Sequence, residues 1–438
     1  MQRAIAPAIC LLVASIALSG CASIRHLFSP LYDQVVLTRH PEPAYEALYP
    51  QYAEVCALTQ FRRLDGVEGG APGHAVMYLK GVCRDPDAPY PRIKSCDEAV
   101  VDPMDPGHGV GISVNKMFKN INWMATPGKR LFLDGDVKPS DRLTREHYDA
   151  VLEEAVEMGM MRGIEIHDSY LEEKDPSQSL EDFIAEHSIG TDFALRFART
   201  IYCSRLPLTA EQMILVMDYL NRLNEEYALG EADYNWSGYS DNCVHTLHNA
   251  LAAALIWKPK SIRTIKLRQF FNLAIPSNEV VNLGALSSLT EFEDPRKVYE
   301  NELWRKTLLQ YDWLPMRHGA LMSSIPIHQD NDLFDTRLRI FVLSRPFGYG
   351  TNKKANLMLR DGRGTELEQN LRWYRRLYED ILAARTGGTK TRSRDPDYRE
   401  FEKRYYIYIE SHLADVNQRL MLLQEERARS RAARSTLH

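Results

Sequence analysis

The stretch that decides the fold runs from Tyr239 to Leu255 and reads Tyr-Ser-Asp-Asn-Cys-Val-His-Thr-Leu-His-Asn-Ala-Leu-Ala-Ala-Ala-Leu. Apolar residues at positions 244, 247, 251, 254 and 255 recur at helical spacing. Ser240, Asp241 and Asn242 are all residue types that cap a helix N-terminus. The sequence therefore predicts a helix with Cys243 in its first turn, where the positive end of the helix dipole favours a thiolate.

Upstream of this helix, His74 stands at the mouth of a predicted strand. Residues 69–83 read Gly-Gly-Ala-Pro-Gly-His-Ala-Val-Met-Tyr-Leu-Lys-Gly-Val-Cys, a turn-rich loop followed by a β-like run that ends at Gly81. A histidine in this place can face a helix N-terminus that packs against the same sheet edge. We therefore expect His74 to be the general base for Cys243.

A second predicted strand follows within Gly-His-Gly-Val-Gly-Ile-Ser-Val-Asn-Lys-Met-Phe, residues 107–118. Apolar residues alternate at 110, 112 and 114, which indicates a strand with one buried face. His108, Ser113 and Asn115 are expected on the other face of this strand or at its edge. Asn115 lies farthest along, so an antiparallel return brings it back towards His74. We expect Asn115 to orient the imidazole, with His108 as the second choice.

Together, the strand that opens His-x-x-x-Tyr-Leu-x-Gly at His74 and the downstream Asn-Cys-x-His at Asn242 resemble the circularly permuted papain-like thiol enzymes. These include the lecithin:retinol acyltransferase group and the permuted relatives of the NlpC-type cell-wall peptidases. The chain is also similar to the domain of the periplasm-facing lipoprotein N-acyl transferases. The resemblance covers about residues 69–257.

The resemblance implies an α+β fold whose permuted papain-like core is an antiparallel sheet packed on the nucleophile-bearing helix. It implies Cys243 as the nucleophile, His74 as the base, and Asn242 as a contact for substrate or oxyanion. The implied activity is that of a hydrolase or acyltransferase, which forms a covalent acyl-enzyme with an amide or ester. The alternative is a non-catalytic scaffold or assembly factor with a degenerate core, in which Cys243 is a buried apolar residue or bridges to Cys203, and His74 is a satisfied edge residue.

The chain contains seven cysteines, and their pairing depends on the compartment. In an oxidising compartment, cysteines pair where geometry allows. Cys83 and Cys96 flank a Pro-rich loop and are expected to form a local clamp. Cys56 and Cys203 are candidates for a second, long-range bridge. Cys243 is then the cysteine that we expect to stay free, because its surroundings differ from those of the other four.

The first twenty residues predict a secretory leader. One positive charge at Arg3 precedes an apolar run from Ala4 to Leu18, which is too short for a permanent membrane helix. The run closes on Leu-Ser-Gly-Cys at 18–21, which resembles the lipobox of bacterial lipoproteins. Cys21 is the expected lipidation site. Because Ala22 follows it, the resemblance implies sorting to the outer membrane, with the body tethered in the periplasm.

The sequence predicts five regions: leader 1–20, tether 21–55, the papain-like domain 56–260, a mixed region 261–360 and a helical C-terminal region 361–438. Residues 140–200, acidic and helical in pattern, are expected to be a solvated insertion.

A net charge of -5 gives no nucleic-acid signature. His245 and His248 do not share a helical face with Cys243, so we expect neither metal nor cofactor. The expected partners are the membrane and a cell-envelope substrate: peptidoglycan, lipoprotein or phospholipid.

Overall fold

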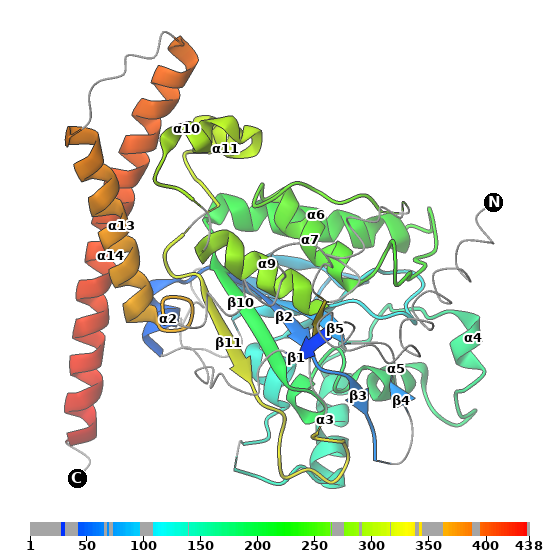
Figure 1. The fold of residues 1–438 in the computed structure, drawn as a ribbon. Helices are drawn as coiled ribbons and strands as arrows, with labels where there is room; N and C mark the ends of the chain where they lie inside the picture. Colours follow the sequence, from blue (N-terminus) through cyan, green and yellow to red (C-terminus); the bar gives the residue numbers. More distant parts are fainter. Residues whose placement is uncertain are drawn as a thin grey trace, which may run out of the picture.

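The structure is a computed structural model, and Figure 1 shows its arrangement. It describes residues 28–30, 43–64, 68–69, 73–96, 108–138, 140–262, 264, 276–288, 291–315, 317–337, 341–343, 362–387 and 395–435. The predicted leader and Cys21 lie outside these residues. No helix in the described part of the chain is long and apolar enough to cross a membrane.

The core is a six-stranded antiparallel sheet with the strand order β11-β10-β2-β5-β8-β9. Its strands are β2 (Tyr52–Leu58), β5 (His74–Lys80), β8 (Val110–Ser113), β9 (Met124–Pro127), β10 (Ile201–Pro207) and β11 (Leu321–Ile325). Short ladders pair β1 (Phe28–Pro30) with β12 (Phe341–Leu343), β3 (Phe61–Arg62) with β4 (Glu68–Gly69), and β6 (Val82–Arg84) with β7 (Ile93–Ser95). The predicted strands after His74 and around residue 112 are therefore confirmed as central members of one sheet.

Helical segments surround this sheet. They are α2 (Pro43–Leu48), α3 (Arg145–Glu157), α4 (Asp168–Leu171), α5 (Leu180–Ser188), α6 (Ala210–Ala228), α7 (Cys243–Ala253), α9 (Pro276–Ser288), α10 (Pro295–Glu300), α11 (Glu302–Tyr311), α13 (Leu367–Gly387) and α14 (Pro396–Ser435), with a π-helical turn η3 (Arg130–Asp134) and a 3-10 turn η4 (Leu195–Phe197). The described fold is thus mixed α and β, with an antiparallel sheet on which the predicted Cys243 helix packs.

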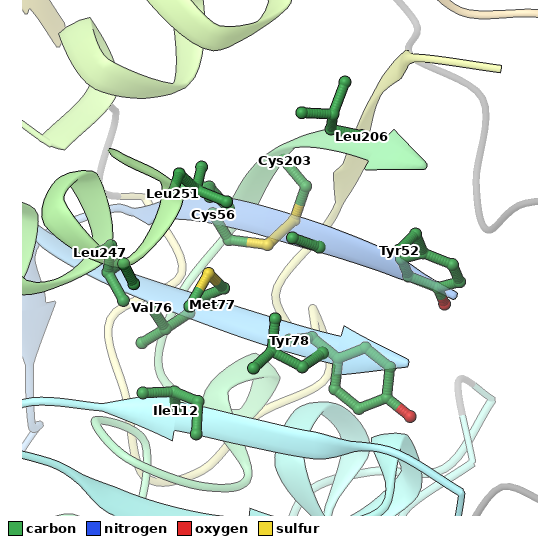
Figure 2. Close-up of a cluster of buried hydrophobic side chains, with 14 of the residues drawn as sticks. Tyr52, Cys56, Val76, Met77, Tyr78, Ile112, Cys203, Leu206, Leu247 and Leu251 are labelled. Atoms are coloured by element: carbon green, nitrogen blue, oxygen red, sulfur yellow. A yellow bond between two sulfur atoms is a disulfide. The ribbon is translucent and has the colours of Figure 1, made fainter. Parts of the chain in front are cut away.

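Both faces of the central strands are covered, because every residue of β2, β5 and β8 is buried. Helices α7 and α9 pack on the sheet, and α6 packs on α7. Figure 2 shows Leu247 and Leu251 of α7 beside the strands that carry Cys56 and Val76. The expectation of one buried face for β8 was wrong. The ring of Phe132 covers Gly111 so closely that a Cβ there would lie 2.0 Å from it.

Two disulfides hold the sheet and its edge loop. Cys56 and Cys203 are directly opposite each other in β2 and β10 and are bonded, as Figure 2 shows. Cys83 and Cys96 are bonded across the β6–β7 hairpin. Cys243 is the free cysteine of the described residues, and it is buried. Both predicted pairings and the free thiol are confirmed, so Cys243 does not bridge to Cys203.

The segment 140–200 differs from the solvated insertion that the sequence predicted. Its helices α3 and α5 do expose acidic residues, but its end is core: Asp192, Phe193 and Leu195 are each fully buried. The sheet also extends past residue 260, because β11 pairs with β10 and α9 packs on β2 and β10. At the C-terminus, α13 and α14 lie side by side and α14 also contacts α2 (Figure 1).

Candidate functional site

Helix α7 begins at Cys243 because Asn242 caps it. The Asn242 Oδ1 accepts hydrogen bonds from the backbone N–H groups of Val244 (2.9 Å) and His245 (3.2 Å). The Asn242 Nδ2 donates to the carbonyl of Gly238 at 3.0 Å, which ties the preceding loop to the cap. His245 completes a capping box from the third helical position. The side chain of Asn242 therefore acts as a helix cap, a use that the sequence had not distinguished from an oxyanion contact.

The Cys243 sulfur lies beside the first residues of β5. The backbone N–H of Ala75, the residue that follows His74, is close enough to act on the sulfur and to lower the pKa of the thiol. Strand β8 pairs with β5 only as far as Ser113 opposite Val76, so the sulfur lies where the ladder between these strands ends. The fold thus brings the start of α7 to the start of β5, as the two motifs predicted.

Burial dominates the ionisation of the thiol. Cys243 is 6% exposed, and burial raises its pKa to about 11. The N–H groups of Ala75 and Val244 and the charge of Arg199 oppose this rise without cancelling it. The helix N-terminus does lower the pKa of Cys243, as expected, but burial outweighs it, and the sulfur is a neutral thiol at neutral pH.

His74 is hydrogen-bonded to Ser113. The His74 Nε2 lies 2.9 Å from the Ser113 Oγ. Because Val76 is directly opposite Ser113 and side chains two residues apart share a face, His74 and Ser113 are diagonal neighbours on the same face of the sheet. Burial, and then the charge of Arg199, lower the pKa of His74 well below its usual value, so the imidazole is neutral.

Asp192 extends this pair into a buried chain. Its Oδ1 accepts a hydrogen bond from the Ser113 Oγ at 2.5 Å, and its Oδ2 accepts one from the Asn115 Nδ2 at 2.7 Å. Burial raises the pKa of Asp192, although the hydrogen bonds from Ser113 and Asn115 oppose the rise. Since Ser113 donates to the carboxylate, its oxygen accepts from His74 Nε2–H, which leaves His74 Nδ1 with the lone pair of a base.

Arg199 supplies positive charge to this buried region. Its Nε donates to the carbonyl of Gly190 at 2.9 Å and its Nη1 to the carbonyl of Thr59 at 3.1 Å. Both carbonyls belong to loops that border β2 and the Asp192 turn. Arg199 is therefore fixed by the backbone, and its charge acts on His74, Cys243 and Asp192 together.

Of the two candidates for orienting the imidazole, only Asn115 lies at this end of the sheet. Asn115 reaches His74 indirectly, through Asp192 and Ser113. His108 precedes β8 at the other end of the strand, where Val110 is opposite Leu79. Leu79 is five residues from His74, so this end of β8 lies roughly 16 Å from His74 at about 3.3 Å per residue.

The other two histidines of α7 have separate partners. His245 Nδ1 lies 3.0 Å from the Asn242 Oδ1, within the helix cap. His248 Nδ1 is hydrogen-bonded to the Glu279 carboxyl group of α9, and its ring stacks on Trp257 with centroids 4.3 Å apart. The His248 ring therefore attaches α7 to its neighbours, while the His245 ring belongs to the cap of α7 itself.

Sequence reasoning missed Asp192 and Arg199 as members of the site. Asp192 was one acidic residue among many in a segment predicted to be solvated, and no local pattern distinguishes it. Ser113 was recognised as polar on the correct strand, but Asn115 was preferred for its distance along the chain. The importance of Ser113 follows from the strand register, which places Ser113 and not Asn115 within reach of His74.

Comparison of the chain with protein-family models, with curated proteins and with solved structures finds no match in any of the three. The chemistry of the site therefore rests on its residues. The site combines a free thiol at a helix N-terminus, a neutral imidazole on an adjacent strand, and a Ser–Asp pair hydrogen-bonded to the imidazole. Nucleophilic cysteine catalysis uses these kinds of group and also needs the thiol and the imidazole within hydrogen-bond reach, whereas the described hydrogen bond of His74 is the one to Ser113.

Proposed function

We propose that the protein is a cysteine-dependent hydrolase or acyltransferase with a permuted papain-like core. The observation that carries the proposal is the His74–Ser113–Asp192 chain, which ends at the strand start where the Cys243 thiol is held. The Ser113–Asp192 pair orients the imidazole and leaves the lone pair on Nδ1, which is the arrangement that a general base uses.

The proposed reaction begins with transfer of the Cys243 thiol proton to His74 Nδ1. The thiolate then attacks the carbonyl carbon of an amide or ester, and a carbon–sulfur bond forms as the carbonyl π electrons move to oxygen. Backbone N–H groups beside the sulfur, those of Ala75 and Cys243, are the available donors for this oxyanion. Because both groups are neutral at rest, His74 acts as a base during attack and not as one half of a standing ion pair.

The tetrahedral intermediate collapses when the carbon–nitrogen or carbon–oxygen bond breaks. His74 returns its proton to the leaving amine or alcohol, and the acyl group stays on Cys243 as a thioester. Water, or an acceptor amine or hydroxyl, then attacks the thioester after giving its proton to His74. The thiolate leaves and is reprotonated. Ser113 and Asp192 are positioning residues that stabilise the imidazolium at each proton transfer.

The proposed location follows from the predicted lipid anchor at Cys21. A body tethered to the periplasmic face of the outer membrane meets amide and ester bonds in peptidoglycan, in lipoproteins and in phospholipids. Labelling with a radioactive fatty acid, followed by mass analysis of the mature N-terminus, tests the anchor. We expect a lipidated cysteine that is absent from the Cys21→Ser variant.

The nucleophile is tested by following formation of the acyl-enzyme. Purified protein is incubated with an acyl thiol-reactive probe and with activated amide and ester substrates, and the intact mass is measured. We expect a single adduct on Cys243 that is absent from Cys243→Ala. In His74→Gln the acylation rate should fall roughly 10²–10⁴-fold, the usual contribution of a general base. Acylation that survives Cys243→Ala would refute the proposal.

The positioning chain is tested with a matched pair of buried serines. Ser113→Ala removes the link between His74 and Asp192, and acylation should slow at least about 10-fold, within the ~10⁴-fold limit for losing an orienting group. Ser204→Ala is the control, because Ser204 is also a buried strand serine but donates to the carbonyl of Val280. Ser113→Thr should restore part of the rate, and the pH profile of acylation should shift only for Ser113→Ala.

A second function is favoured by the burial of the same residues. Cys243 is 6% exposed and His74 is 9% exposed, as expected of a degenerate core in a scaffold protein. The two functions differ in probe access. A scaffold predicts that small alkylating reagents label Cys243 no faster than global unfolding permits, and that Cys243→Ala and His74→Gln change no envelope chemistry.

A further inference from the structure

A second cluster of chemically reactive side chains lies at the opposite side of the sheet-bearing body, where helix α14 meets it. His318 lies in the turn that leads into β11, while His412 and Asp415 project from α14 one helical turn apart. Among the described residues, these three form the group of three or more histidine, cysteine or carboxylate side chains whose possible ligand atoms all lie within 4.8 Å of one another.

The donor atoms of this cluster converge on one point. His318 Nε2 lies 3.3 Å from His412 Nδ1 and 3.1 Å from Asp415 Oδ2. A tetrahedral ion bound at about 2.0–2.1 Å separates its ligand atoms by about 3.3 Å. Two of the three separations therefore already match, and the third lies within 4.8 Å, which a small rotation of the His412 ring or the carboxylate can close.

The surroundings orient these side chains as metal ligands are oriented. His318 Nδ1 lies 3.0 Å from the hydroxyl of Tyr49, which fixes the ring and directs Nε2 at the cluster. Arg419 Nε donates to Asp415 Oδ2 at 2.9 Å.

We propose that His318, His412 and Asp415 bind one divalent transition-metal ion, best matched by Zn²⁺, which clamps α14 to the sheet-bearing body. Two imidazole nitrogens with one carboxylate are ligands that Zn²⁺ favours, whereas Mg²⁺ and Ca²⁺ favour oxygen. The side chain of Asp415 is 36% exposed, so the fourth position is open to water. His318 is buried, so the ion joins an exposed helix to the body of the molecule.

The positive charge of Arg419 is the strongest objection to a cation here. Its Nε donates to Asp415 Oδ2, the oxygen that also lies nearest to His318, so a bound ion must share this oxygen with Arg419 or take Oδ1. The guanidinium is also held by the ring of Tyr49, at 4.2 Å, and by the carbonyl of Leu48, which fixes Arg419 as a hydrogen-bonding partner of a ligand. We expect Arg419→Gln to tighten or retain binding, whereas Asp415→Asn should abolish it.

The test uses the full chain in a Cys243→Ala background, which removes the free thiol as a competing ligand and separates this site from the proposed function. After chelator treatment and dialysis, Zn²⁺ and Co²⁺ are titrated. We expect about one Zn²⁺ per chain by elemental analysis, and the intense visible absorption of tetrahedral Co²⁺. His412→Gln and Asp415→Asn replace half-buried side chains of α14 by polar residues of similar size, so both variants should fold. Each should weaken binding about 100-fold or more, since even outer partners of ligands contribute ~10–100-fold.

The matched control is His147→Ala, a histidine on α3 outside the cluster, which should bind Zn²⁺ as the parent does. Amide hydrogen exchange of residues 395–435 should slow when Zn²⁺ is added to the parent and should not slow in His412→Gln. The proposal is overturned if the parent binds less than stoichiometric metal, if His412→Gln and Asp415→Asn bind as tightly as the parent, or if bound Zn²⁺ leaves exchange in α14 unchanged.

Discussion

At the scale of single residues, the site sets burial against polar stabilisation. Burial keeps Cys243 neutral at neutral pH despite the N–H groups and the charge of Arg199, whereas burial and that same charge together keep His74 neutral. A nucleophile that is neutral at rest is protected from oxidation and alkylation, because the thiolate is the reactive form. Reactivity then depends on a base that is already fixed in the correct tautomer, which is what Ser113 and Asp192 provide.

The raised pKa of Cys243 predicts how stability depends on pH. The folded thiol has a pKa of about 11, and the unfolded thiol has the usual value of 9.0. Between these values the unfolded chain has released the proton and the folded chain keeps it, so the free energy of unfolding falls as pH rises. The loss should reach about 2–3 kcal/mol by pH 11.

Denaturant unfolding at a series of pH values measures this loss. Tyrosine and lysine groups also ionise in this range, so the comparison is with Cys243→Ser. The difference in unfolding free energy between the two proteins should be constant below pH 9 and should shrink above it. A difference that stays constant up to pH 11 contradicts a buried neutral thiol.

Sequence reasoning found the residues whose local pattern reports their role, and it missed those defined by contact. Cys243 was found because a cap, an apolar stripe and a spare thiol coincide, and His74 because it opens a strand. Asp192 lies 79 residues from Ser113 along the chain, and nothing near it records that contact. The Asp192 turn is held by Thr126 of β9, whose hydroxyl donates to the Asp192 carbonyl at 3.1 Å, while the neighbouring η4 packs on η3, and these contacts are properties of the tertiary structure.

At the scale of secondary-structure elements, the position of Cys243 depends on where α7 begins. Residues 240–242 all suit a cap, and the structure selects Asn242, because its amide accepts two helix N–H groups and also donates to Gly238. This cap holds the first turn of α7 against β5. The sequence predicted the helix and its start to within a residue, because capping chemistry is local; it could not predict that β8 ends where the sulfur lies.

The capping boxes of α6 and α7, both in the described part of the chain, allow a matched test of this cap. Asn242→Ala and Thr209→Ala each remove a capping oxygen, from α7 and α6 respectively, and each should cost about 0.5–2 kcal/mol of unfolding free energy. Only Asn242→Ala should also slow acylation of Cys243. Asn242→Asp keeps the accepting oxygen, so it should recover most of the stability. Equal loss of acylation in Thr209→Ala would indicate a general effect of instability.

At the scale of the whole molecule, the two disulfides close loops of very different length. Cys56–Cys203 spans 147 residues and joins β2 to β10, whereas Cys83–Cys96 spans 13 residues within one hairpin. The sequence predicted the local pair from its loop. It offered the long pair only as a candidate, because the direct opposition of the two strands is a feature of the sheet register.

The loop lengths predict unequal costs for losing the two bonds. In the chain-entropy model, closing the long loop contributes roughly 5 kcal/mol and closing the short one roughly 3 kcal/mol. Replacing Cys56 and Cys203 together by alanine should therefore lower the unfolding free energy by about 2 kcal/mol more than replacing Cys83 and Cys96. Both variants are best made in Cys243→Ala, so that no free thiol exchanges with the remaining bond.

The same pair of variants separates stability from the site. Strand β2 lies between β10 and β5, so the long disulfide supports the strand that carries His74. With Cys243 restored, loss of Cys56–Cys203 should reduce acylation at temperatures well below unfolding, while loss of Cys83–Cys96 should leave the rate unchanged. If both variants lose stability equally, the long bond stabilises the protein through contacts in the folded sheet and not through its loop. If both also keep full activity, β2 does not need this bond to hold β5 in place.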